Sequence, residues 1–132
     1  MSKQTAYQIA CKKLKRKAAT IKDFNHETED DRVMCFGEHK FRTCIKAANL
    51  DENGNPFNPD WKNWSQPKYR IWMDANLDSN RPSGVGFSFD VSYRGGSYSL
   101  VGSRLQSRTE KIAREIANNH EIVEYFNEWL GV

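Results

Sequence analysis

The C-terminal part of the chain carries the strongest fold signal, a helix start followed by an apolar stripe. Ser107-Arg108-Thr109-Glu110 has the pattern of a capping box, in which the Ser107 hydroxyl accepts from the Glu110 amide and the Glu110 carboxylate reaches back. Apolar residues then recur with a helical period at Ile112, Ile116, Val123, Phe126 and Leu130. The pattern predicts one long amphipathic helix that packs its apolar face against a sheet.

Charge is segregated along the start of the chain. Residues 1–22 contain seven basic side chains and no acid, whereas residues 23–31 contain five acids. Apolar residues at helical spacing predict a basic amphipathic helix from about Thr5 to Ala18. The two segments either neutralise each other in a helical hairpin or leave a basic surface open to a ligand.

The acidic segment favours the N-terminus of a second helix, because acids there suit the helix dipole. This helix is expected from Thr28 or Glu29 to Asn49 and would bury one face. Gly37 lies inside it and marks a point where it could kink. The residues expected on the buried face are Val33, Phe41, Cys44, Ile45 and Ala48.

Alternating patterns between residues 69 and 101 predict strands. Residues 69–73 and 86–93 alternate apolar with polar, and Arg94-Gly95-Gly96-Ser97 has the composition of a hairpin turn into a third strand at 98–101. The expected fold is α+β: two N-terminal helices, a three-stranded antiparallel meander, and the long capped C-terminal helix, with the second helix also on the sheet. We expect a single domain over residues 1–132, in which the basic helix of residues 1–22 is peripheral to a core of residues 23–132.

The sequence indicates an intracellular protein. Cys11, Cys35 and Cys44 are an odd number of cysteines without framework spacing, which is typical of reduced thiols. There is no signal peptide and no apolar run long enough to span a bilayer. We therefore expect a cytoplasmic location in the host cell and no membrane partner.

Three segments together resemble a known group of proteins. They are Asn58-Pro59-Asp60-Trp61 with Lys68-Tyr69-x-x-Trp72, then Gly86-Phe87-Ser88-Phe89, then Val101-Gly102-Ser103-Arg104-Leu105 before the last helix. This order is similar to that of small proteins encoded by phages and prophages of Bacteroidota. Gln106 and Ser107 depart from the group, which usually has Cys and Phe there. The resemblance implies a phage-borne accessory protein and brings no catalytic residues with it.

Sequence patterns that would indicate a catalytic or metal site are weak. No nucleophile elbow or phosphate-binding glycine loop occurs, and no neighbouring pattern around His26, His39 or His120 selects a nucleophile. Cys35-x-x-x-His39 lacks further zinc ligands, and the calcium-like run from Asp74 lacks the required glycine and glutamate. We expect no enzyme activity, no metal and no cofactor.

Two groups of residues could bind a ligand. A macromolecule-binding surface is predicted from the basic cluster and the surplus tryptophans, namely Lys12, Lys13, Lys15, Arg16, Lys17, Trp61, Trp64 and Trp72. An anion site is conceivable at the start of the last helix, from Ser103, Arg104, Ser107 and Arg108. For the second group a purely structural role is favoured, in which Ser107 only caps the helix.

The leading hypothesis is a phage-encoded, non-enzymatic binding protein that docks on a host or phage protein or ribonucleoprotein. An inhibitor of a host defence system, of the anti-CRISPR type, is its concrete version. The first alternative is direct binding of RNA or DNA through the basic helix. The second is a structural protein of the virion.

Overall fold

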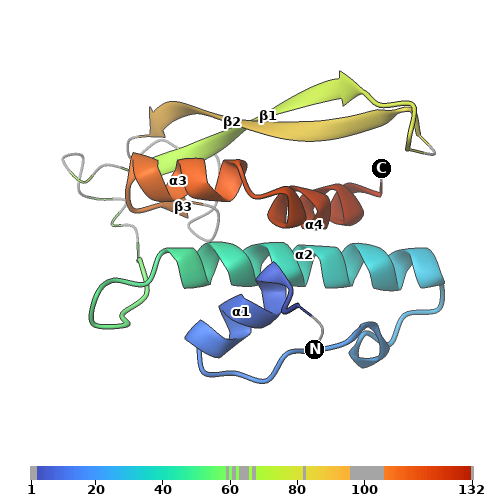
Figure 1. Cartoon of the computed structure of the whole chain (residues 1–132), viewed down its shortest axis with the longest axis horizontal. Coiled ribbons are helices and arrows are strands. Elements are labelled where there is room, and N and C mark those ends of the chain that lie inside the picture. The colour runs from blue at the N-terminus through green and yellow to red at the C-terminus, as the bar shows by residue number, and fades with distance from the viewer. Residues whose placement is uncertain are drawn as a thin grey trace.

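The computed structural model describes residues 3–58, 60, 62, 66, 68–81, 83–95 and 106–131. Its elements are α1 (Ala6–Lys13), η1 (Ile21–Asp23), α2 (Glu29–Ala48), β1 (Lys68–Leu77), β2 (Val85–Gly95), β3 (Gln106–Ser107), α3 (Glu110–Ala117) and α4 (His120–Leu130). They stack in layers, with the strands on one side, α3 and α4 beneath them, then α2, and α1 on the far side (Figure 1). None of the helices in the described ranges combines the length and apolar character needed to cross a membrane.

Helix α1 is shorter than predicted and ends in a sharp turn. Thr5 and Gln8 form a capping box at its start. At its end Lys15 has a left-handed backbone with φ of 56°. The Lys15 amide bonds to the Lys12 carbonyl (3.1 Å) and the Arg16 amide to the Cys11 carbonyl (3.0 Å), which is a Schellman motif. This motif ends the helix before Ala18, although the apolar spacing continues.

Helix α2 begins and ends where the sequence predicts. The Thr28 hydroxyl accepts from the Asp31 amide (3.1 Å) and three acids occupy the first turn. The helix runs through Gly37 without a break. A Cβ at Gly37 would lie 2.7 Å from the Glu128 Cβ and 2.8 Å from the Trp129 amide nitrogen. Gly37 therefore allows the close approach of α4 and does not introduce a kink.

The prediction of a single long C-terminal helix is wrong, because the structure has two helices there. Thr109 caps α3 by accepting from the Ile112 amide (3.2 Å), so the predicted cap at Ser107 is also wrong. Asn118 ends α3, and the Asn119 side chain accepts from the amides of Glu121 (3.0 Å) and Ile122 (3.2 Å) to start α4. An asparagine that caps a new helix competes with continuation of the old one. The buried face therefore shifts after residue 119.

The predicted α+β fold around a three-stranded meander is wrong as well. The strand order is β2-β1-β3, so β1 is central, and β3 has only two residues. Of the turn expected at Arg94-Gly95-Gly96-Ser97, Arg94 and Gly95 instead extend the β1–β2 ladder, where they pair with Tyr69 and Lys68, and the other two residues lie outside the described residues. The third strand expected at 98–101 lies outside the described residues.

The described core is helical. Among the side chains that the structure describes, every member of the core cluster comes from a helix, and the described chain is predominantly helical. Helix α2 packs against both α1 and α4, and the α3–α4 layer separates it from the strands, so the prediction that α2 covers the sheet is wrong (Figure 1). The core residues are Tyr7, Ala10, Cys11, Phe41, Cys44, Ile45, Ala47, Ile116, Ile122, Tyr125 and Phe126.

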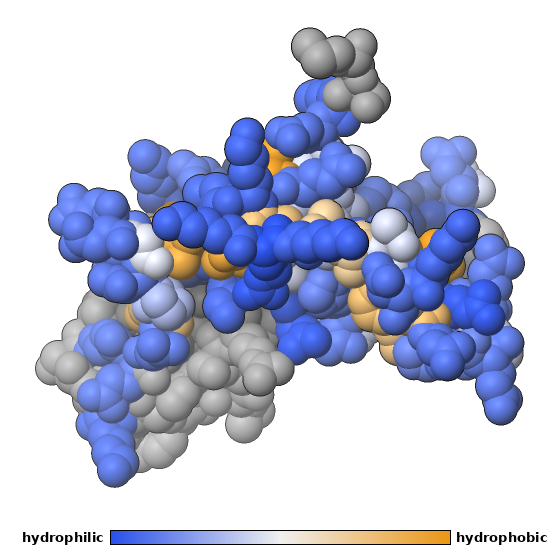
Figure 2. Space-filling view, turned by 90° about the horizontal axis from the view of Figure 1, so that it is seen from below, coloured by the Kyte–Doolittle hydropathy of each residue, from blue (hydrophilic) through white to orange (hydrophobic). Residues whose placement is uncertain are grey.

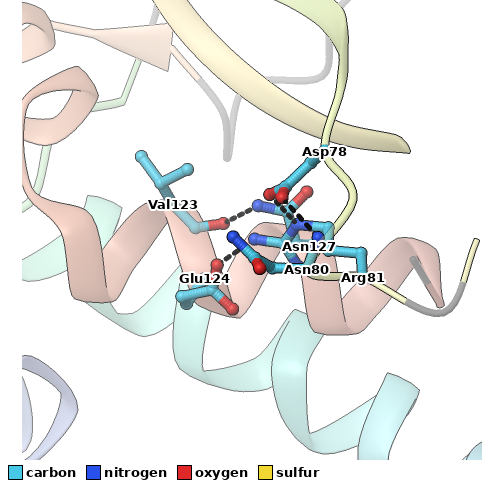
Figure 3. A network of polar contacts seen from close by, with 6 residues as sticks. All are labelled: Asp78, Asn80, Arg81, Val123, Glu124 and Asn127. Carbon is cyan, nitrogen blue, oxygen red and sulfur yellow. Dashed lines mark hydrogen bonds and ion pairs between the residues drawn. The ribbon is translucent and has the colours of Figure 1, made fainter. Parts of the chain in front are cut away.

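The β1–β2 hairpin is fastened to α4 at its tip. The Arg81 guanidinium donates to the Asp78 carboxylate (3.2 Å) within the turn and to the Glu124 carboxylate on α4. Figure 3 shows Arg81 between these two acids, with Asn127 of α4 beside them. This contact connects the strand layer to the helical core at the end opposite to β3 (Figure 1).

The close approach at Gly37 gives a first prediction. Alanine normally favours a helix interior over glycine by about 1 kcal/mol. We nevertheless expect Gly37→Ala to destabilise the protein by about 1–3 kcal/mol in urea unfolding, because its Cβ would overlap the backbone of α4. Lys111→Ala on the exposed face of α3 is the control and should change stability by less than about 0.5 kcal/mol. A stabilised Gly37→Ala variant would show that α4 does not lie this close.

Candidate functional site

The predicted basic cluster lies where α1 ends. Lys12 and Lys13 occupy the last turn of α1, and Lys15, Arg16 and Lys17 follow in the Schellman turn and the segment after it. All five side chains are exposed. The cluster therefore curves around the end of the helix and does not form a stripe along one helix face.

The acids of residues 23–31 do not neutralise this cluster. Within residues 3–58, which the structure describes without a gap, no ion pair joins the five cations to these acids. Asp23 instead accepts from the Thr20 amide (2.7 Å), and Asp31 accepts from the Thr28 hydroxyl (2.8 Å). These two acids serve helix starts, so the cations remain open to solvent and to ligands.

A cavity of about 420 Å³ opens beside the basic cluster. Arg16 lies at its edge and belongs to both. Its lining combines the loop after α1, the C-terminal half of α2 and the loop after α2, with Arg16, His39, Arg42, Lys46, Asn49 and Phe57 among its residues. No carboxylate of the described residues lines it. A volume of this size is in the range of small-ligand pockets.

The cavity is electropositive. Glu38 is the acid that touches its cations, with its carboxylate 3.2 Å from Arg42 Nε one turn earlier on the surface of α2. Both side chains are half-buried and the contact lacks a hydrogen bond at Arg42 Nε, so this pair is weak. Among the described residues, Arg16 and Lys46 take part in no ion pair.

A neutral histidine forms part of the same wall. The Tyr7 hydroxyl accepts from the Ala19 amide (2.8 Å) and lies 3.0 Å from His39 Nε2. Burial, followed by the charges of Arg16 and Arg42, lowers the pKa of His39, and burial raises the pKa of Tyr7 to about 12. Both groups are therefore neutral near pH 7, and they share a hydrogen bond. This contact holds the segment that carries Arg16 against α2.

The predicted anion site is used structurally where the structure describes it. Ser103 and Arg104 lie outside the described residues. Ser107 is fully buried and accepts from the Asn49 side-chain amide (3.3 Å). Arg108 donates its backbone amide to Asn49 Oδ1 (2.6 Å) and its guanidinium to the Asn49 carbonyl (3.1 Å). These contacts fasten the start of α3 to the end of α2.

Arg108 also positions the aromatic residue of the cavity. Its guanidinium lies over the Phe57 ring, 5.0 Å from the ring centroid. Sequence reasoning missed both Asn49 and Phe57. The signal for Asn49 was its place at the end of α2, where an asparagine often caps, but nothing local predicts a partner 58 residues away.

The predicted tryptophans cannot be placed beside the basic cluster or the cavity. Trp61 and Trp64 lie outside the described residues. Trp72 is placed in β1, opposite Asp90 of β2, and only its backbone is described. Of the predicted macromolecule-binding residues, the structure therefore brings together the five cations at the end of α1.

The structure also describes the residues considered as metal ligands or reactive thiols. Within the described ranges no group of three or more His, Cys, Asp and Glu side chains comes together to hold a metal ion. All three cysteines are free, as predicted. His39 faces Tyr7 and not Cys35, whose thiol lies 3.4 Å from His26 Nε2. The buried Cys44 has its pKa raised to about 12 by desolvation, so its thiol is inert.

Comparison with known proteins assigns no family to this chain. No family model matches it. No curated protein and no solved structure gives a significant match. The resemblance to phage proteins therefore stays a prediction.

The lowered pKa of His39 gives a second prediction. As pH falls through about 6.5, the unfolded chain takes up a proton at His39 before the folded protein does, so stability falls. The melting temperature of the wild type should decrease between about pH 7.5 and pH 5.5, and His39→Gln should reduce that decrease. Glutamine keeps a hydrogen-bonding side chain beside Tyr7 but cannot take up a proton. Equal slopes for the wild type and His39→Gln would contradict the neutral His39.

Asn49 gives a third prediction. Asn49→Ala removes the partner of the buried Ser107 side chain and of the Arg108 amide. Unsatisfied buried groups are costly, so we expect a loss of about 2–4 kcal/mol in urea unfolding. Asn118→Ala at the exposed end of α3 is the matched control and should lose less than about 0.5 kcal/mol. Similar losses in the two variants would show that the Asn49 contacts are not formed.

Proposed function

We propose that this protein is a non-enzymatic binding protein of phage origin that docks on an anionic host or phage macromolecule. Its contact surface is the basic cluster of Lys12, Lys13, Lys15, Arg16 and Lys17. Its ligand is nucleic acid, either free or exposed on a ribonucleoprotein. The uncompensated charge of the cluster, next to an electropositive cavity, is the observation that carries the proposal.

The physical basis is the release of counterions. A polyanion carries condensed cations, and exposed Lys and Arg side chains that replace them gain free energy when the salt concentration is low. Cations that are already paired with carboxylates gain much less. In the described structure Asp23, the nearest acid in sequence, is bonded to Thr20, and no acid of residues 23–31 forms an ion pair with the five cations, so they keep this capacity.

The character of the surface supports a polar ligand. Seen from the α1 side, hydrophilic residues cover most of the described surface, and apolar residues appear in small patches between them (Figure 2). Protein–protein contacts are usually anchored by buried apolar and aromatic side chains, whereas nucleic-acid contacts are more polar and positively charged. This face suits the second type.

The resemblance to phage-encoded proteins supports the biological setting. An accessory protein of a phage that binds nucleic acid could act on a defence ribonucleoprotein of the host, as an anti-CRISPR-type inhibitor does. The non-enzymatic character is supported by the cavity, where the Thr43 hydroxyl donates to the His39 carbonyl (2.7 Å) and His39 Nε2 faces Tyr7. These hydrogen bonds occupy the Thr43 hydroxyl and His39 Nε2, the two groups that would have to serve as nucleophile and general base.

Binding of a labelled single strand tests the proposal. Wild-type protein should bind an RNA of about 20 nucleotides in low salt, measured by fluorescence anisotropy, and affinity should fall steeply as salt rises. The triple variant Lys12→Gln, Lys13→Gln, Lys17→Gln removes three cations that do not line the cavity. It should bind at least about tenfold more weakly, with the salt slope shallower by roughly 0.7 for each phosphate that the variant no longer neutralises.

The control removes charge elsewhere. Lys111→Gln with Arg114→Gln on the exposed face of α3 should bind as the wild type does, because these residues lie away from the cluster. If the wild type binds no RNA or DNA in low salt, or if both variants weaken binding equally, the proposal fails.

A further inference from the structure

The cavity beside the basic cluster is lined by two chemically different groups of residues. The first group, here called the cationic wall, is Arg16 from the segment after α1 and Arg42 and Lys46 from α2. The second group, the aromatic wall, is apolar and contains Ile45, Pro56 and Phe57. A single ligand that fits both walls needs an anionic group at one end and a flat, weakly polar group at the other.

The cationic wall suits a phosphate better than a carboxylate. Two guanidinium groups and one ammonium group supply many donors in separate directions, and no acid among the described lining residues competes for them. A phosphate offers more acceptor oxygens and more charge than a carboxylate, so it satisfies more of these donors. The buried Arg42 Nε has no hydrogen-bond partner in the described structure, because its contact with Glu38 lacks hydrogen-bond geometry.

Phe57 of the aromatic wall is held by Arg108. Arg108 is anchored to Asn49 by two hydrogen bonds and lies over the Phe57 ring. A ring fixed in this way loses little side-chain entropy when a planar group stacks on it. Bases stack on aromatic side chains irrespective of sequence, which suits a pocket without base-specific readers.

We propose that this cavity binds a nucleoside phosphate, with the phosphate on Arg16, Arg42 and Lys46 and the base against Phe57. The nucleoside phosphate is either a free nucleotide or one unit of a single strand held by the basic cluster, and the second source rests on the proposed function. Arg108 acts as a positioning residue for Phe57. Arg16 connects the cavity to the cluster, so a strand could follow the cations and place one nucleotide in the cavity.

Calorimetry with defined probes tests the site. The probes are adenosine and cytidine monophosphates, inorganic phosphate, and a single-stranded oligonucleotide of about ten nucleotides. We expect a nucleotide to bind more tightly than inorganic phosphate, because only the nucleotide uses the Phe57 wall. Inorganic phosphate that binds as tightly as both nucleotides would overturn the proposal.

Two variants test the cationic wall and the aromatic wall separately. Lys46→Glu places a carboxylate among the cations and should weaken nucleotide binding at least about tenfold. Phe57→Ala should weaken nucleotide binding by about tenfold and leave phosphate binding unchanged. Since Phe57→Ala could disturb the loop, Lys46→Glu at an exposed position of α2 provides the independent test, with Lys111→Glu on α3 as its control.

The outcomes also distinguish this site from the basic cluster. If mononucleotides bind and Lys46→Glu abolishes this, the site takes free nucleotides, even if no strand binds. If only the oligonucleotide binds and both cavity variants weaken it, the site holds one unit of a strand. If the oligonucleotide binds and depends on Lys12, Lys13 and Lys17 but not on Lys46 or Phe57, the cavity proposal fails and the docking surface stands. If no probe binds, both fail.

Discussion

The contact between α2 and α4 at Gly37 is the constraint on which the rest of the structure depends. The absence of a side chain lets the two backbones meet, and the contact is reinforced beside it, where Lys40 pairs with Glu128 (2.7 Å) and lies over the rings of Phe36 and Tyr125. Helix α1 packs on α2 and also reaches α4, because the Ala6 amide donates to the Glu121 carboxylate (2.8 Å) and the Tyr7 amide to the Tyr125 hydroxyl (3.3 Å). The hairpin is in turn fastened to α4 through Arg81 and Glu124. The layers are therefore positioned through the pair of α2 and α4.

The sequence predicts elements better than it predicts their arrangement. Helix α2 was predictable because its acidic start, Thr28 cap and apolar face agree. The break at Asn118-Asn119 could not be predicted, because the apolar stripe continues across it. The break arises because the Asn119 side chain caps α4, and this cap competes with one more turn of α3. The strand order was also hidden, since Gly95 has the composition of a turn residue although it pairs with Lys68. Pairing between strands is a long-range property that local turn composition does not determine.

One part of the candidate site was likewise predictable from the sequence, and another part was not. The exposed cations were predictable from composition, because a run of Lys and Arg that cannot be buried must remain at the surface. The cavity was not, because its walls come from three segments that only the packing of α1 on α2 brings together. Ser107 and Arg108 look like ligands for an anion in the sequence, yet both residues hydrogen-bond to Asn49. No pattern near residue 107 indicates that partner.

The Tyr7 hydroxyl closes the chain between residues 7 and 19 into a loop, because it accepts from the Ala19 amide while its own ring is buried in the core. The five cations lie on this closed loop and not on a free arm. A flexible basic tail loses much conformational entropy when a polyanion captures it, whereas cations on a loop with both ends held lose less. The cluster is therefore preorganised, so its charge can contribute to affinity with a smaller entropic loss than the same residues would suffer in a disordered tail.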